Sequence, residues 1–231
     1  MNNTLLSYAF NEERKLVHID TVKNGLECNC TCPGCNEHLI AKNSKKIRQH
    51  HFAHQSGNDC GTGYETIRHI WAKEILFEYK ILPVAIDGKK GYLRTAQIGM
   101  EVILTDLNII PDIFGKVILP CNYLGLQLPA EIPFIVEIFV NHKVDDEKAA
   151  IIKRNGIPAI EIDLSKSTAT TKEDLIKDIS NQENWIVIND KIGRRFLPRI
   201  NLPNISIGFP RDRNIYPSTR RTCYRNYKKR R

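Results

Sequence analysis

The chain has 231 residues, and its 34 Lys and Arg against 26 Asp and Glu give a formal net charge of +8. Residues 211–231 hold nine basic side chains and one acid, so they carry the whole excess and residues 1–210 sum to zero. An apolar content of 42% excludes wholesale disorder. No apolar run approaches the roughly 20 residues of a membrane span, and no basic-then-apolar leader opens the chain, so we expect a cytoplasmic protein without a membrane anchor.

The predicted elements begin with a small β unit over 4–26, followed by a hairpin that pairs 39–42 with 47–50. A helix is predicted over 64–80, because its apolar residues recur at the helical period and Pro83 follows. Glu65, His69 and Lys73 are spaced by four on one face of this helix.

The second half of the chain alternates strands and helices. Its predicted elements are strands at 92–105, 109–114, 117–120 and 133–141, a helix at 144–155, a strand at 158–164, a helix at 171–181 and a strand at 185–188. This order predicts an α/β fold with a mixed sheet and helices on its faces. Residues 198–219 lose periodicity and gain prolines, which indicates a linker. We therefore predict an N-terminal module over 1–62, a main domain over 63–197 and a linker with a basic tail over 198–231.

The cysteines are concentrated near the N-terminus. Five of the seven lie within residues 28–60, and an odd count without a leader favours a reduced compartment over a disulfide framework. Cys32 and Cys35 enclose a Pro-Gly turn, which aims two thiolates at one point and lets backbone N–H groups face the sulfurs. The pair is typical of a Zn²⁺ site, although ordinary buried cysteines are the alternative.

Two further ligands would complete a tetrahedral zinc site. His51, His54 and Cys60 compete for these two places, and we favour His54 with either His51 or Cys60, while Cys28 and Cys30 remain further candidates. Four protein ligands would close the site, so we expect zinc to be structural. A polar stretch this short needs the metal to hold a core.

Two carboxylates form the second pattern. Asp112 follows Pro111 at the end of a predicted strand, and Glu137 lies inside a very apolar one. An ionised acid is costly to bury there unless it is paired or bound to a metal. Two such donors on adjacent strands could hold Mg²⁺ or Mn²⁺ and activate a water for phosphodiester cleavage, with Glu65 as a third acid.

These residues resemble a known superfamily. Pro111-Asp112 followed by an embedded Glu137, after a helix bearing Glu65, is similar to the PD-(D/E)XK nucleases. The cysteine knuckle, the run from His51 to His54, Cys60 and the helix with His69 resemble the competence protein CoiA-like family more narrowly. The resemblance covers about residues 28–165. It implies a restriction-endonuclease-like core with a zinc module, which acts on DNA in uptake, processing or antiviral defence.

One position departs from the superfamily pattern. A lysine is expected two residues after the strand glutamate, and this chain has Phe139 there. Lys148 and Lys73 are the candidate substitutes. Asn141 falls on the same strand face as Glu137, and His142 behind it is a candidate proton shuttle or an ordinary loop histidine.

The basic tail has two interpretations, a solvated end or a nucleic-acid contact. Tyrosines interleave with the basic residues, which favours DNA because rings can stack on bases beside phosphate contacts. The candidate contacts are Arg220, Arg221, Arg225, Lys228, Lys229, Arg230 and Arg231. The favoured function is Mg²⁺- or Mn²⁺-dependent DNA cleavage. The alternatives are a catalytically inactive DNA-binding adaptor and a protein-interaction module whose tail binds an acidic partner.

Overall fold

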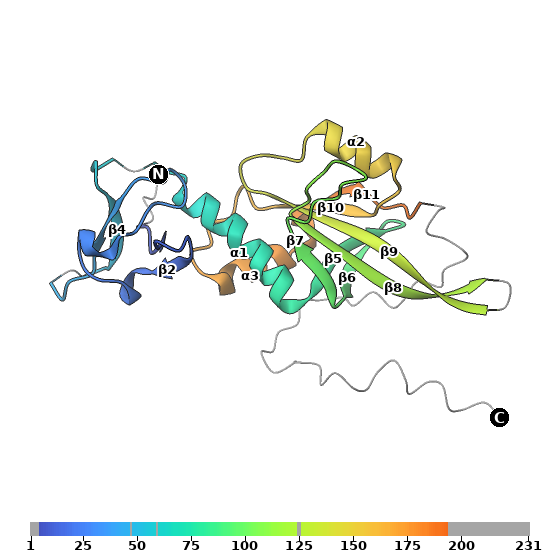
Figure 1. The fold of residues 1–231 in the computed structure, drawn as a ribbon, viewed down its shortest axis with the longest axis horizontal. Helices are drawn as coiled ribbons and strands as arrows, with labels where there is room; N and C mark the ends of the chain where they lie inside the picture. Colours follow the sequence, from blue (N-terminus) through green and yellow to red (C-terminus); the bar gives the residue numbers. More distant parts are fainter. Residues whose placement is uncertain (1–4, 47, 59, 124–125, 194–231) are drawn as a thin grey trace, which may run out of the picture.

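A long helix, α1 (Gly63–Tyr79), joins two parts of different build in the computed structural model, which describes residues 5–46, 48–58, 60–123 and 126–193 (Figure 1). The smaller part precedes α1. Its buried apolar side chains belong to residues 9–52, whereas those of the largest cluster belong to residues 64–185. Each part therefore has its own core, and α1 belongs to the larger one.

The N-terminal part consists of two small antiparallel sheets. One pairs β1 (Tyr8–Phe10) with β2 (Leu16–His18), and the other pairs β3 (Leu39–Lys42) with β4 (His51–His54). Short 3-10 turns at Ile19–Thr21 and Leu26–Cys28 connect them.

The predicted partner of the strand at 39–42 was wrong. Residues 51–54 pair with it, and residues 48–50 lie in no strand. The physical reason is burial: Phe52 pairs with Ala41 inside the small core, a position that the polar residues 48–50 could not fill.

The larger part is built on a five-stranded mixed sheet with the order β11-β10-β9-β8-β7. Its strands are β7 (Gln97–Met100), β8 (Ile113–Tyr123), β9 (Leu126–Phe139), β10 (Ala159–Asp163) and β11 (Trp185–Asn189). Only β9 and β10 pair in parallel, and α2 (Asp146–Arg154) makes their crossover. With α3 (Lys172–Ser180) and a 3-10 turn at Gln182–Asn184, this confirms the predicted mixed-sheet fold of helices and strands.

The two faces of the sheet have different covers. In Figure 1, α2 lies above β10 and β11, while α1 and α3 lie together on the other side. Phe134, Val136 and Ile138 of β9 pack in the cluster that contains α1 and α3, and Ile135 packs with Ile152 of α2. Because strand side chains alternate, Glu137 faces α2.

A hairpin of β5 (Ile81–Ile86) and β6 (Lys89–Arg94) follows α1 and was not predicted. The helix ends at Tyr79 because Lys80 takes a left-handed conformation with φ 52°, and Pro83 lies inside β5 opposite Tyr92. Proline is tolerated there because β5 pairs with β6 alone in a two-stranded sheet.

The strand predictions at 92–105 and 109–114 were too long at this edge. Residues 101–111 form a loop with a single bridge between Leu104 and Ile109, and β8 starts only at Ile113. Asp112 therefore precedes a strand instead of ending one. Within the described ranges, no helix has the length and apolar character needed to cross a membrane.

Candidate metal centre and carboxylate site

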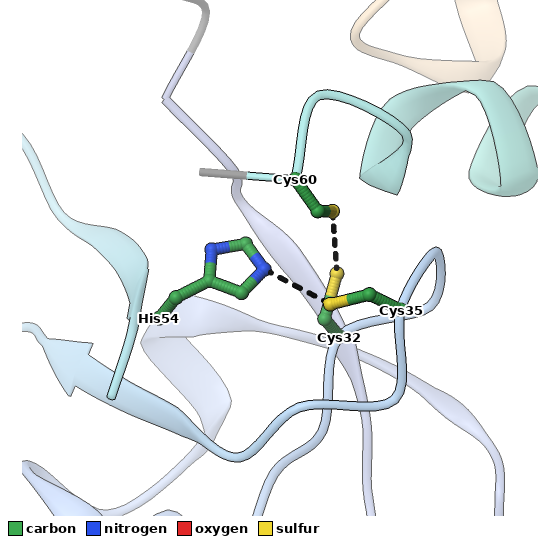
Figure 2. Close-up of side chains that lie close together, drawn as sticks. All are labelled: Cys32, Cys35, His54 and Cys60. Carbon is green, nitrogen blue, oxygen red and sulfur yellow. Dashed lines mark hydrogen bonds between the residues drawn. The ribbon is translucent and has the colours of Figure 1, made fainter. Parts of the chain in front are cut away.

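Four side chains from three separate segments converge in front of α1 (Figure 2). Cys32 and Cys35 lie on the turn that precedes β3, His54 ends β4, and Cys60 lies in the loop before α1. Their ligand atoms all lie within 4.8 Å of one another. Among the described residues, this is the one group of three or more His, Cys, Asp or Glu side chains gathered this closely.

Two of the distances between ligand atoms are close to those of tetrahedral coordination. The Cys32 and Cys60 sulfurs are 3.6 Å apart, and the Cys35 sulfur is 3.4 Å from Nε2 of His54. Bonds of about 2.3 Å to sulfur and about 2.1 Å to nitrogen at tetrahedral angles separate such atoms by about 3.5–3.8 Å. The Cys₃His cluster could therefore bind a metal such as zinc.

The thiols have unequal acidities. Burial raises the pKa of Cys32 to about 12, although backbone N–H groups of Gly34 and Cys35 donate to its sulfur and oppose this. Burial also acts on Cys60, but hydrogen bonds from Thr62 and the neighbouring thiols lower its pKa to about 6. The N–H groups on Cys32 are those that the Pro-Gly turn was predicted to supply.

His51 lies apart from this cluster. Its Nδ1 contacts the carbonyl oxygen of Gln49 at 2.9 Å, and strand alternation places it on the opposite face of β4 from His54. Cys28 and Cys30 lie outside as well, since their thiols donate to the carbonyl groups of Leu39 and Cys28. The structure thus brings together four of the five predicted ligands.

The cluster is packed against the start of α1. A Cβ atom on Gly34 would lie 2.3 Å from Oγ1 of Thr62 and 2.9 Å from the backbone nitrogen of Gly63. Farther along the helix, Tyr64 donates its hydroxyl hydrogen to the carbonyl of Leu5 and accepts from the N–H of Ser7. Only glycine fits the knuckle at this position, so the cluster and the helix N-terminus are held together.

Asp112 and Glu137 meet at the edge where β8 begins. Ile113 pairs with Val136 in the antiparallel ladder, so the preceding residue, Asp112, lies at the level of Glu137. Oδ2 of Asp112 accepts the N–H of Ile138 at 2.8 Å. Glu137 lies on β9, and Asp112 directly precedes the neighbouring strand β8, so the two carboxylates lie at the same level of the sheet.

Helix α1 contributes two basic side chains to Asp112. Nε2 of His69 lies 3.1 Å from Oδ1 of Asp112, and Nζ of Lys73 lies 4.0 Å from the same oxygen. Lys73 also donates to Glu101 at 2.6 Å. Burial acts to raise the pKa of Asp112, but His69, the Ile138 N–H and Lys73 together lower it below its ordinary value, so Asp112 is ionised.

Glu137 is buried, with 6% of its surface exposed. Lys148 of α2 donates to its Oε2 at 2.8 Å and to the carbonyl of Ile110 at 2.8 Å. Oε1 has no hydrogen-bond partner among the described residues. Burial raises the pKa of Glu137 to about 7, and the charge of Asp112 adds to this rise. Lys148 acts in the opposite direction, but its effect is smaller than that of burial.

The remaining predicted residues lie around this pair. Glu65 accepts from Asn141 at 2.7 Å, which ties α1 to the end of β9. His142 is exposed in the segment after β9, and Phe139 has Lys143 over its ring at 5.3 Å. The tail residues Arg220, Arg221, Arg225, Lys228, Lys229, Arg230 and Arg231 lie outside the described residues.

A third buried carboxylate was missed. Glu161 of β10 is 3% exposed, pairs directly with Glu137 in the parallel ladder and accepts the N–H of Val144. Burial raises its pKa above the ordinary value. The signal was present, because Glu161 stands between two isoleucines in a strand as Glu137 stands between valine and isoleucine.

Comparison with known families bears on the N-terminal part. Residues 13–63 match the model of the competence protein CoiA, N-terminal domain, which supports a CoiA-like N-terminal region. The matched range contains all four residues of the Cys₃His cluster and ends where α1 begins. No curated protein and no solved structure matches the chain. The restriction-endonuclease-like character of the core therefore stays a prediction.

Proposed function

We propose that this chain, with its CoiA-like N-terminal region, is a metal-dependent DNA nuclease that acts in DNA uptake and processing or in defence against foreign DNA. The observation that carries the proposal is Oε1 of Glu137, a buried carboxylate oxygen without a partner among the described residues. Leaving such an oxygen unsatisfied is costly. A divalent cation shared with Asp112 would remove that cost.

The donor set suits a hard cation. Asp112 and Glu137 offer carboxylate oxygens, and Mg²⁺ is commonly held by one or two carboxylates with water and substrate phosphate completing the shell. A bound Mg²⁺ or Mn²⁺ would lower the pKa of a coordinated water and neutralise charge on a phosphodiester. Two carboxylates alone form an incomplete shell, which leaves room for the substrate.

Lys148 supplies the function of the lysine that Phe139 replaces. Its ammonium group has three donor hydrogens, and Glu137 and Ile110 take two of them. The third can orient a water or contact a phosphate oxygen. Lys73, by contrast, is directed to Glu101 and Asp112, and Glu65 is held by Asn141 at the rim. Within this proposal His142 keeps its role as a proton shuttle.

Zinc has a separate, structural role in this proposal. The Cys₃His cluster offers four protein ligands, which leaves no open position for substrate. Its contact with Thr62 and Gly63 supports a role in holding the start of α1, the helix that carries His69 and Lys73 toward Asp112.

The test is cleavage of single- and double-stranded DNA by the zinc-loaded chain with added Mg²⁺ or Mn²⁺. We expect metal-dependent products, their loss in Asp112→Asn and Glu137→Gln, and a drop of about 100-fold or more in Lys148→Ala. Glu147→Gln and Lys153→Ala, which alter exposed residues of α2, should cleave like the unmodified chain.

Two outcomes would contradict the proposal. If DNA stays intact with either metal, the chain is an inactive DNA-binding adaptor or a protein-interaction module. If cleavage occurs but Asp112→Asn and Glu137→Gln retain it, the activity resides elsewhere or comes from a contaminant.

A further inference from the structure

A groove with a volume of about 630 Å³ lies between the N-terminal part and the larger core. Strands β1 and β2 and the turn between them form one wall, and α1 with the end of β7 and the start of α3 forms the other. The residues that decide its chemistry are Tyr8, Phe10, Arg14, Trp71, Lys73 and Lys172.

One end of this groove lies at the carboxylate site. Lys73 and Glu101 line it, and Lys73 also lies 4.0 Å from Oδ1 of Asp112. The backbone N–H of Glu101 donates to the carbonyl of Asp112 at 3.0 Å. A chain lying in the groove would therefore arrive beside Asp112.

The groove combines rings with positive charge. Tyr8 and Trp71 meet edge to face at 4.8 Å between ring centres, and the Arg14 guanidinium lies 4.6 Å above the ring of Phe10. Four basic residues line the groove against two acids, Glu74 and Glu101. These acids pair with Lys172 and Lys73 at 2.8 Å and 2.6 Å, so the lining residues keep a net excess of two positive charges.

We propose that this groove binds a single-stranded segment of nucleic acid and leads it to the carboxylate site, a refinement that rests on the proposed function. Rings beside cationic side chains are the general means of holding single strands, because unpaired bases stack on rings while phosphates contact the charges. In a duplex the base faces are already stacked on one another, so Phe10 and Tyr8 would have nothing to bind.

The first test is photocross-linking of the full, zinc-loaded chain to a 5-iodouracil single-stranded oligonucleotide without added Mg²⁺ or Mn²⁺. We expect adducts on the peptide that contains Tyr8 and Phe10, the two partly exposed rings of the groove. Arg14→Ala and Lys172→Ala should each lower the yield about five-fold. Lys177→Ala is the matched control, because Lys177 lies on α3 like Lys172 and pairs with an acid but lies outside the groove.

Phe10→Leu provides a second variant that keeps an apolar side chain in β1, and zinc content with circular dichroism confirms its fold. Adducts confined to peptides outside the groove, or equal adducts with a blunt duplex, would overturn the inference even if the chain cleaves DNA. Groove adducts in a chain that never cleaves would leave the inference standing and remove the nuclease proposal.

Discussion

Two glutamates on the α2 face of the sheet, Glu137 and Glu161, are the residues whose chemistry depends most on burial. They are direct partners in the β9–β10 ladder, and both have a raised pKa. Glu137 has Lys148 beside it, whereas the hydrogen bond of Glu161 comes from the Val144 backbone. An acid that prefers its neutral form when buried destabilises the fold as the pH rises.

Glu161→Gln should therefore raise the free energy of unfolding, relative to the unmodified chain, by more at pH 8 than at pH 5. Burial raises the folded-state pKa of Glu161 above its ordinary value of 4.5, with Asp163 and Asp112 adding to the rise and Val144 and Lys143 opposing it. The contribution of Glu161 to the stability of the folded state is fully present below pH 4.5. It is lost as the pH rises through the raised pKa. Glutamine stays neutral and still accepts the Val144 N–H.

Urea unfolding at several pH values, without added Mg²⁺, measures this effect. Tryptophan fluorescence reports on the larger core, because Trp71 and Trp185 both belong to its cluster. Glu147→Gln in the exposed first turn of α2 is the control. Parallel stability curves for Glu161→Gln and the unmodified chain would show that Glu161 ionises normally in the fold.

At the scale of elements, α2 and α3 are matched nine-residue helices with the same kind of N-cap. Asp145 accepts the N–H of Lys148 at 2.7 Å, and Thr171 accepts the N–H of Asp174 at 3.2 Å. Each cap contributes about 1 kcal/mol to stability. Only the cap of α2 also fixes the backbone of a proposed catalytic residue.

Asp145→Ala and Thr171→Ala should each lower the free energy of unfolding by about 1 kcal/mol. In the cleavage assay, Asp145→Ala should slow the reaction because the backbone of Lys148 loses its anchor, while Thr171→Ala should leave it unchanged. Urea titrations and single-turnover rates at saturating protein give the two quantities. Equal rates for both variants would mean that Lys148 does not depend on the cap, or has no role in cleavage.

How far the sequence predicts the elements depends on how local their causes are. The helix at 64–80 was predicted within one residue of Gly63–Tyr79, because its apolar spacing is local. The hairpin Ile81–Arg94 was missed because Pro83 looked like a stop, although an isolated two-stranded sheet tolerates it. Glu161 was missed because its meaning comes from pairing with Glu137, a contact made across a crossover. That Cys60 and not His51 completes the cluster is equally non-local, since Cys32, Cys35, His54 and Cys60 come together from three separate segments.

At the scale of the whole molecule, we expect the N-terminal part to need a metal for its stability and the larger core to be stable without one. The hydrophobic cluster of the N-terminal part holds seven buried apolar residues, whereas the largest cluster, in the larger part, holds 27. A core this small is rarely stable without a metal or disulfides. We expect one zinc per chain, and chelation or Cys32→Ser should expose the amides of β3 and β4 to hydrogen exchange while those of β9 and β10 stay protected.

The control for zinc is Cys28→Ser, because Cys28 lies outside the Cys₃His cluster. Elemental analysis should find one zinc in this variant and less in Cys32→Ser. Less than one zinc in the unmodified chain, or intact protection of β3 and β4 after chelation, would contradict a structural zinc site.

The net positive charge lies in a segment separate from the residues that we propose for DNA cleavage. Residues 1–210 are neutral overall, and residues 211–231 carry the net charge of +8. Deleting 211–231 should therefore weaken DNA binding and flatten its salt dependence. If about six tail cations contact phosphates, the slope of log K against log salt should fall by about 4 on a single strand.

Cleavage of short substrates at saturating concentration should persist, because Asp112, Glu137 and Lys148 are untouched. Loss of that cleavage would mean that the tail takes part in the site itself.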